Sequence, residues 1–222
     1  IVAAVGDRTK MIVLCNPNNP TGHIIPRDRI EHVINNVSCP VLIDEAYAEF
    51  AGVSHMDLAD AYDHVIVLRT LSKFAGLAGL RVGYGVFPEA LLPYLRKVTP
   101  AFANISLLAA TIAMAALDDL DILEERRTVL VSERERVYAA LDDMDGLIPY
   151  PSGTNFILFA TPLADSTPIL RGVAEKDIFI RKPGNPGLEH CLRVSIGTPE
   201  ENSAFLSGLA NVLADIQQGS QV

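Results

Sequence analysis

Short apolar runs alternate with helix-like stretches through the first half of the chain. Four of these runs are typical of strands buried on both faces: MIVLCN (11–16), PVLID (40–44), VIVLR (65–69) and RVGYGVF (81–87). Between the first two runs, apolar residues recur at helical spacing over residues 27–37, at Ile30, Val33, Ile34 and Val37. This strand–helix–strand alternation predicts a mostly parallel sheet flanked by helices. The connection after residue 44 is less regular, and we expect mostly loop there.

The second half of the chain has a different pattern. Residues 105–117, ISLLAATIAMAAL, are apolar but fall short of the ~18 to 20 residues that a membrane span requires, so we expect a buried helix. A long charged helix is expected from about Leu117 to Met144. After it we expect three strands and two helices: NFILFA (155–160), a helix near 166–175, DIFIRK (177–182), CLRVSIG (191–197) and a helix from Pro199 to about Ile216.

The last of these helices carries a start signal. Thr198, Pro199 and Glu201 supply a capping hydroxyl, a proline at the first helical position and an early acidic residue. Few strands and two or three helices predict a smaller α+β domain. We expect the domain boundary inside the long helix, which divides the chain into residues 1–118 and 119–222.

Composition excludes several classes of protein. Of 222 residues, 49% are hydrophobic and 20% are charged, as in a packed globular protein and unlike a disordered one. A net charge of −9 argues against a nucleic-acid binder. Three cysteines and five histidines show no metal-ligand spacing, so no metal site is expected, and the odd cysteine count favours a reducing compartment, the cytoplasm. The opening residues resemble the end of a helix and a turn, so we expect the chain to begin within a domain.

Polar residues follow three of the predicted parallel strands. Because the carboxyl ends of parallel strands meet at one edge of a sheet, the polar residues that follow them are expected to converge there. The residues concerned are Asn19 in NPNNPTG, Asp44, Tyr47 and Lys73. Taken singly, each has an ordinary explanation: turn chemistry for NPNNPTG, a helix cap for Asp44 and a solvated surface amine for Lys73.

Taken together, these residues indicate one kind of chemistry. Lys73, held in a crevice at the sheet edge, would offer a primary amine as a nucleophile. Two hydroxyls and a guanidinium near it suit a dianion: Thr70, Ser72 and Arg81. Gly76 and Gly79 would allow a close backbone approach.

A ring-shaped ligand suits the remaining residues. Asp44 can hold a proton on an aromatic nitrogen, and Asn19 and Tyr47 can bond an oxygen on the same ring. A lysine able to form a Schiff base, a phosphate pocket and a carboxylate for a pyridinium together indicate pyridoxal 5′-phosphate (PLP).

Five segments occur in an order that resembles a known family: NPNNPTG, LIDEAYAEF, RTLSKFAGLAGLRVGYG, SGTNFIL and CLRVSIGTPEEN. From about Asp7 to Glu201 the chain resembles the fold-type I PLP aminotransferases and, within them, the histidinol-phosphate aminotransferase group. The resemblance implies an α/β fold: the mostly parallel sheet of a large domain, here incomplete because family members are longer at the N terminus, and a smaller C-terminal α+β domain.

The resemblance also implies a role for each candidate residue of the cofactor site. Lys73 would hold the cofactor covalently and carry a proton at the substrate Cα. Asp44 would pair with the pyridine nitrogen, and Asn19 and Tyr47 would bond the phenolic oxygen. The phosphate would lie on the three residues Thr70, Ser72 and Arg81.

On the substrate side, Arg193 would hold an α-carboxylate, as a planar guanidinium fork does well, and Asn155 would assist it. Arg181 would lie near the substrate's phosphate, although the segment reads R-K-P where the family usually has R-P. The segment TPAFANIS (99–106) replaces a usual P-F-N or P-Y-N step, which affects the expected substrate-side wall.

These implications lead to an expected enzyme, a cytoplasmic homodimer that transfers an amino group from L-histidinol phosphate to 2-oxoglutarate. No membrane or nucleic-acid partner is expected. Three alternatives stay open: an aromatic-amino-acid aminotransferase, a decarboxylase of a phosphorylated amino acid, and a non-catalytic fragment of such an enzyme.

Overall fold

The computed structural model describes residues 1–99 and 104–219, which form two compact units. The first unit comprises residues 1–18 and 24–127, and the second comprises residues 19–23 and the chain from Thr128 onward. The division therefore falls inside helix α6 (Leu120–Asp142), somewhat later than residue 118. The short segment 19–23 comprises the last four residues of NPNNPTG and His23.

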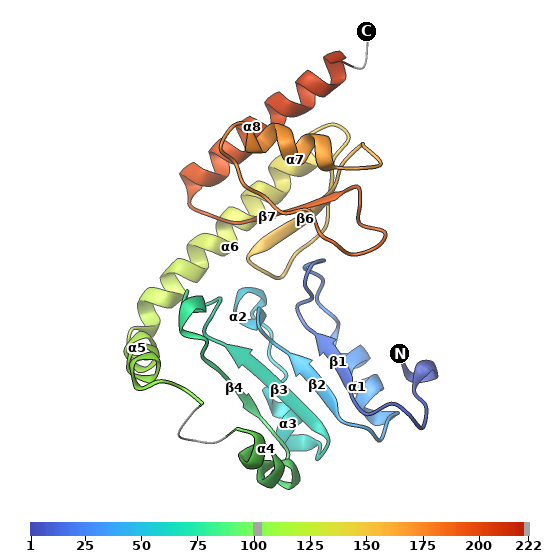
Figure 1. The fold of residues 1–222 in the computed structure, drawn as a ribbon, viewed down its shortest axis with the longest axis vertical. Helices are drawn as coiled ribbons and strands as arrows, with labels where there is room; N and C mark the ends of the chain where they lie inside the picture. The colour runs from blue at the N-terminus through green and yellow to red at the C-terminus, as the bar shows by residue number, and fades with distance from the viewer. Residues whose placement is uncertain (100–103, 220–222) are drawn as a thin grey trace. The chain divides into compact units, whose positions relative to one another are not determined.

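A four-stranded sheet forms the centre of the first unit (Figure 1). Its order is β1-β2-β3-β4; the first three strands are parallel, and β4 runs antiparallel to β3. The predicted mostly parallel sheet is confirmed. The strands are β1 (Ile12–Cys15), β2 (Val41–Asp44), β3 (Val65–Thr70) and β4 (Gly83–Val86).

Helices connect these strands. The predicted helix after β1 is confirmed as α1 (Arg27–Asn35). The connection after β2 contains two short helices, where we expected mostly loop. The helical elements of this unit are η1 (Val2–Ala4), α2 (Ala48–Ala51), α3 (Met56–Ala61), η2 (Ala78–Leu80), η3 (Glu89–Leu91), α4 (Leu92–Val98) and α5 (Leu107–Asp118).

The core of the first unit lies on one face of the sheet. Ile12 and Leu14 of β1 pack in one cluster with Ile30 and Ile34 of α1. Val13 points to the opposite face, because successive side chains of a strand alternate, and it is 62% exposed. The expectation that every strand is buried on both faces was therefore wrong for β1, and also for β4, where Tyr84 is 49% exposed.

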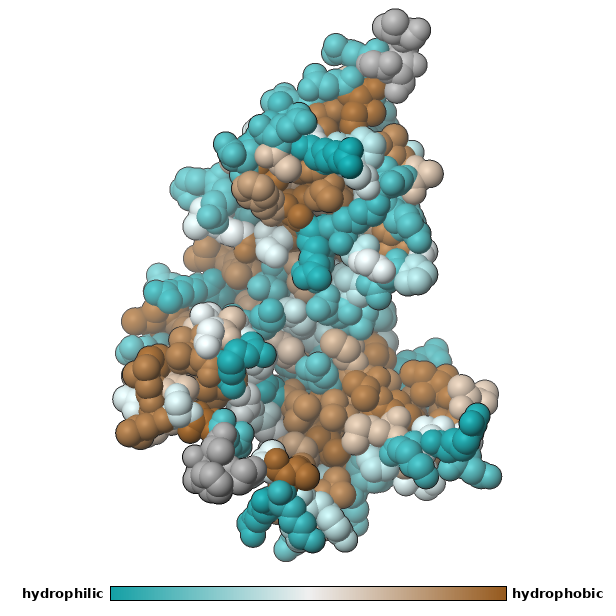
Figure 2. Space-filling model, in the orientation of Figure 1, coloured by the Kyte–Doolittle hydropathy of each residue, from teal (hydrophilic) through white to brown (hydrophobic). Residues whose placement is uncertain are grey.

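Helix α5 is apolar but mostly exposed, which corrects the expectation of a buried helix. Only its small residues Ala109 and Ala113 are buried; they belong to a cluster with residues of the β3–β4 connection. Leu107 is 84% exposed and Met114 is 67% exposed, because the larger side chains point away from that cluster. Figure 2 shows the apolar surface over α5. The expected long helix at about 117–144 is confirmed as α6 (Leu120–Asp142), which Asp119 separates from α5.

The second unit has an antiparallel three-stranded sheet in the order β5-β6-β7. Its elements are β5 (Ile148–Pro149), β6 (Phe156–Ala160), β7 (Cys191–Ser195), α7 (Thr167–Ala174) and α8 (Pro199–Gly219), together with most of α6. The predicted start of α8 is confirmed as a capping box. The Thr198 hydroxyl accepts from the Glu201 amide at 3.2 Å, and the Glu201 carboxylate accepts from the Thr198 amide at 2.8 Å.

The expected strand at residues 177–182 is not formed. Only Arg181 pairs with the sheet, through a single bridge to Arg193. Asp177 has a left-handed backbone (φ 59°), and Pro183 has no amide hydrogen to donate, so the segment cannot continue a ladder at either end.

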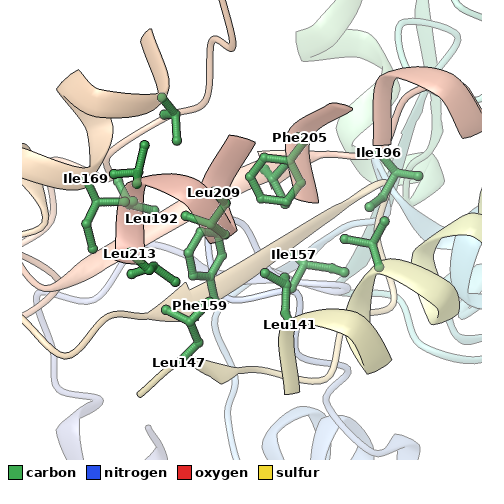
Figure 3. Packing of buried hydrophobic residues seen from close by; sticks show 14 residues of the cluster. Leu141, Leu147, Ile157, Phe159, Ile169, Leu192, Ile196, Phe205, Leu209 and Leu213 are labelled. Atoms are coloured by element: carbon green, nitrogen blue, oxygen red, sulfur yellow. The ribbon is translucent and has the colours of Figure 1, made fainter. Parts of the chain in front are cut away.

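The core of the second unit surrounds β6, every residue of which is buried. Ile157 and Phe159 pack in a cluster that includes Leu192 of β7 and Leu209 of α8 (Figure 3). The alternate residues, such as Leu158, join a second cluster on the other face. Helices cover one face, and Leu188 and Cys191 pack on the other, which explains why FILFA (156–160) is continuously apolar. Among the described residues, no helix is long and apolar enough to cross a membrane.

Candidate active site

Three polar residues of the first unit lie where β2 and β3 end. Asp44 is the last residue of β2, in register with Leu68 of the parallel strand β3. Tyr47 follows at the start of α2 and is 6% exposed. The Lys73 Nζ atom lies 5.7 Å from the centre of the Tyr47 ring. The two loops that leave these neighbouring strands therefore bring the amine and the phenol side by side.

Lys73 is exposed, contrary to the expected crevice. Lys73 lies in the turn that follows β3, and this turn contains Gly76, which has a positive φ of 68°. That backbone conformation explains a glycine at this position. A Cβ built on Gly76 or Gly79 would meet no protein atom within 4 Å, so the space beside both glycines is open.

The Asp44 carboxylate is partly engaged by its own turn. Its Oδ1 atom accepts a hydrogen bond from the Ala46 amide at 3.0 Å. Helix α2 begins only at Ala48, with Tyr47 at its N-cap, so Asp44 does not cap a helix that starts at Glu45.

The three predicted phosphate ligands lie at the end of β3, where Thr70 is the last residue, and on the β3–β4 connection, which carries Ser72 and Arg81. The Thr70 hydroxyl donates to the Ser72 hydroxyl at 2.9 Å, and the Ser72 amide donates back to Thr70 Oγ1 at 3.1 Å. Arg81 stands at the end of η2 with a positive φ of 57°, and its Nη1 donates to the Ala78 carbonyl at 3.2 Å. Two coupled hydroxyls and a guanidinium suit a small dianion.

The second unit contains the other predicted residues. Arg193 lies on β7, and its Nη1 donates to the Asn19 Oδ1 atom at 2.6 Å. The Arg193 guanidinium also lies 4.5 Å from the centre of the Phe156 ring. Backbone hydrogen bonds of 3.0 Å and 2.7 Å hold Arg181 beside Arg193. The Asn19 carboxamide thus meets Arg193 from a segment far away in the sequence, and Arg181 lies beside Arg193.

These side chains line one cavity of about 250 Å³ within the second unit. Two arginines and no acidic residue line it, so its chemistry favours an anionic ligand. The lining residues are Asn19, Pro20, Arg181, Pro183, Gly184, Asn185 and Arg193.

A close backbone contact holds the Asn19 segment in place. The Gly153 amide donates to the Gly22 carbonyl at 2.8 Å. Gly22 has a φ of 74°, and a Cβ at that position would collide with Ser152. Glycine is therefore required both by the backbone conformation and by the space available.

Asn155 is not among the residues that line this cavity. Its backbone carbonyl accepts from the Ile196 amide at 2.9 Å, which joins β6 to the end of β7. Residues 100–103 of the expected substrate-side segment lie outside the described residues.

Sequence reasoning missed a buried ionic cluster beside Asp44. The Glu45 side chain is 0% exposed, and its Oε2 accepts two hydrogen bonds from Arg69, from Nε at 3.0 Å and from Nη2 at 2.8 Å. Its Oε1 accepts from the backbone amide of His55 at 2.5 Å and lies 2.9 Å from the His55 Nδ1. Burial acts to raise the pKa of Glu45, but the hydrogen bonds from His55 and Arg69 outweigh it and hold the pKa below its usual value. The sequence offered two signals for this cluster: Glu45 follows the apolar run 40–44, and Arg69 ends the next run, 65–69.

Three histidinol-phosphate aminotransferases illustrate the similarity to known proteins. The chain is 42% identical over 213 residues to the enzyme of Roseiflexus castenholzii, which covers 93% of this chain and 56% of that protein. It is 41% identical to the enzyme of Thermoanaerobacter pseudethanolicus, covering 92% of this chain and 57% of that one. For histidinol-phosphate aminotransferase 1, chloroplastic, of Arabidopsis thaliana, the identity is 40%, with 91% and 49% covered. The chain thus spans about half the length of these relatives.

Solved structures show the same fold. The histidinol-phosphate aminotransferase of Clostridium acetobutylicum matches with a TM-score of 0.87 and 26% identity, over 94% of this chain and 65% of that one. The enzyme of Sinorhizobium meliloti, solved in complex with pyridoxal-5′-phosphate, matches with a TM-score of 0.81 and 28% identity, over 93% of this chain and 58% of that one. The family model "Aminotransferase class I and II" matches residues 2–209. The chain therefore belongs to the class I and II aminotransferases, with the fold of the fold-type I enzymes.

Proposed function

We propose that the protein is a PLP-dependent aminotransferase that moves the amino group of L-histidinol phosphate to 2-oxoglutarate, a step of histidine biosynthesis. The products are imidazole acetol phosphate and glutamate. The observation that carries the proposal is the amine of Lys73 beside the Tyr47 ring, with Asp44 at the end of the neighbouring strand. Further support comes from relatives that are named histidinol-phosphate aminotransferases.

The residues of the first unit fit PLP. The cofactor has an aldehyde, a pyridine nitrogen and a phosphate, and the unit offers an amine, a carboxylate and a set of hydroxyl and guanidinium donors. The hydroxyls of Thr70 and Ser72 are already held 2.9 Å apart at the start of the connection that carries Arg81. When bound, PLP supplies an aldehyde that captures amino groups and a ring that accepts electrons from the substrate Cα.

Each residue of the chain would then perform one task. Lys73 Nζ would hold the cofactor and later move a proton from and to the substrate Cα. Asp44 would keep a proton on the ring nitrogen, so that the ring stays electron-poor. Tyr47 would orient the ring through its phenolic oxygen, a role that we also propose for Asn19.

The second unit would bind the anionic groups of the two substrates. L-Histidinol phosphate carries a phosphate ester, and 2-oxoglutarate carries an α-carboxylate. Arg181 and Arg193 line one cavity, and planar guanidinium groups match both anions. We propose Arg193 for the carboxylate and Arg181 for the phosphate, with Asn155 as an assisting residue.

The half-reaction tests this function directly. L-Histidinol phosphate, added without an acceptor to the purified protein loaded with PLP, should abolish the visible absorption band of the bound cofactor, and 2-oxoglutarate should restore it. The band is followed by recording absorption spectra before and after each addition. A band that does not respond would favour an aromatic-amino-acid aminotransferase or a decarboxylase, and the absence of any band would refute the cofactor.

Arg181 separates the proposed donor from an aromatic one. Arg181→Leu should raise the KM for L-histidinol phosphate about 10- to 100-fold, since hydrogen bonds between charged groups contribute about 1.5–3 kcal/mol. The KM for phenylalanine, which has no phosphate, should stay within about twofold of wild type. Steady-state kinetics with both donors make the comparison, and equal effects on both would contradict the phosphate role.

Two further expectations belong to this proposal and derive from the family resemblance. The protein should be a homodimer, which analytical ultracentrifugation tests. It should also be cytoplasmic, which cell fractionation tests.

A further inference from the structure

Glu45 connects the two strand ends that carry the proposed cofactor residues. It directly follows Asp44, the last residue of β2, and its amide donates to the Leu68 carbonyl of β3 at 2.9 Å. Its carboxylate is held by the fork of Arg69, the residue of β3 that precedes Thr70. One residue thus ties β2 to β3 through both its backbone and its side chain.

The same carboxylate also fixes the loop that follows α2. The backbone amide and the ring of His55 both contact Glu45 Oε1. His55 and Arg69, which hold the carboxylate, both belong to the first unit. Because the side chain is fully buried, a change in its charge cannot be compensated by water.

Arg69 also has a second carboxylate within reach. Glu49 Oε1 lies 3.5 Å from the Arg69 Nη1 atom, and Glu49 Oε2 is buried with no hydrogen-bond partner among the described residues. Burial raises the pKa of Glu49. Arg69 is therefore shared between two carboxylates, and its shorter contacts, of 2.8 Å and 3.0 Å, are those to Glu45.

We propose that Glu45 is a positioning residue, which uses the Arg69 fork to set the distance between Asp44 and the Thr70–Lys73 turn. The inference rests on the proposed function, because that distance matters for a ligand that contacts both segments. A well-packed apolar pair would contribute as much stability as a buried ion pair. What the bidentate fork adds is a fixed geometry between two strand ends.

The test is the affinity of the purified protein for PLP. Glu45→Gln keeps the size of the side chain and removes the charge. We expect the dissociation constant of PLP to rise about 10- to 100-fold, by analogy with residues that orient the ligands of a metal ion. Glu31→Gln is the matched control, because Glu31 forms an exposed ion pair with Arg27 in the same unit, and its PLP affinity should stay within about twofold of wild type.

A second readout does not need the cofactor. Hydrogen exchange followed by mass spectrometry on the cofactor-free protein should be faster in peptides covering residues 44–50 and 68–74 of Glu45→Gln, and unchanged in the control. Normal exchange or unchanged PLP affinity in the folded variant would overturn the inference. If Glu45→Gln does not fold, Arg69→Lys replaces it. That variant keeps the charge but loses the fork, and it should bind PLP about tenfold more weakly; unchanged affinity would equally overturn the inference.

The two proposals fail in different ways. A wild-type protein that does not bind PLP would refute the proposed function and this inference with it. A wild-type protein that binds PLP, beside a folded Glu45→Gln variant with the same affinity, would refute the positioning role alone.

Discussion

Replacing Lys73 with alanine should lower the turnover of L-histidinol phosphate at least about 10⁴-fold. A positioned proton-transfer group contributes about 10²- to 10⁴-fold by itself, and Lys73 would also serve as the covalent holder of the cofactor. Its Nζ lies beside the Tyr47 ring at the sheet edge. The turn at residues 71–76 contains no second lysine that could take its place. The rate is measured by single-turnover absorption kinetics with excess L-histidinol phosphate.

The chain offers a close control for this variant. Lys97 is another exposed lysine of the first unit, and its Nζ lies 5.4 Å from the Tyr94 ring centre, much as Lys73 lies beside Tyr47. Lys97→Ala should keep the wild-type rate within about twofold, as surface substitutions usually do. Borohydride reduction followed by peptide mass spectrometry should place the trapped cofactor on Lys73. A trapped adduct elsewhere, or an active Lys73→Ala variant, would remove Lys73 from the mechanism.

Replacing Arg193 with leucine should lower kcat/KM for 2-oxoglutarate about 10²- to 10⁴-fold. Two charge-assisted hydrogen bonds to a carboxylate are lost, each worth about 1.5–3 kcal/mol. The Asn19 side chain would also lose the donor that holds it at 2.6 Å. Steady-state kinetics with the acceptor as the varied substrate test this, together with a thermal melt to exclude unfolding.

Two further variants test whether Arg193 acts through its planar guanidinium or only through its positive charge. Arg193→Lys keeps the charge but loses the planar fork and its stacking on Phe156, so it should recover only part of the activity. Arg171→Leu removes an exposed arginine of α7 in the same unit and should leave kcat/KM nearly unchanged. Full activity of Arg193→Lys would show that a positive charge is sufficient, and a large effect of Arg171→Leu would point to a general loss of structure.

Local patterns predicted the secondary structure where local physics governs it. β6 lies within the expected segment because residues 156–160, FILFA, form an uninterrupted apolar run. Helix α8 begins at Pro199 because hydroxyl, proline and acid occupy the first positions of a capping box. Residues 178–180, IFI, are as apolar as a strand, but the segment is bounded by the left-handed backbone of Asp177 and by Pro183, which has no amide hydrogen, and only Arg181 pairs with the sheet. Those are properties of the chain path, and hydrophobicity does not report them.

For the candidate site too, some features could be predicted from the sequence and others could not. Lys73, Asp44 and Tyr47 could be proposed from sequence because each follows a predicted strand, and parallel strands end at one edge. The order of apolar and polar residues does not report how exposed a loop residue is, and Lys73, which we expected in a crevice, is exposed in the structure. The cavity that joins Arg181 to Arg193 depends on a bridge between two strand-like segments, which no local motif encodes.

By itself, the sequence determined the order and approximate bounds of most strands and helices, the chemical types of the candidate site residues and the family to which they belong. These follow from periodicity and from the order of short segments along the chain. Only the tertiary structure decided that α5 presents its large apolar side chains to solvent, that Glu45 is buried against Arg69, and that Asn19 contacts a residue of β7. Exposure and long-range pairing depend on which segments come together in space, and that is a property of the whole fold.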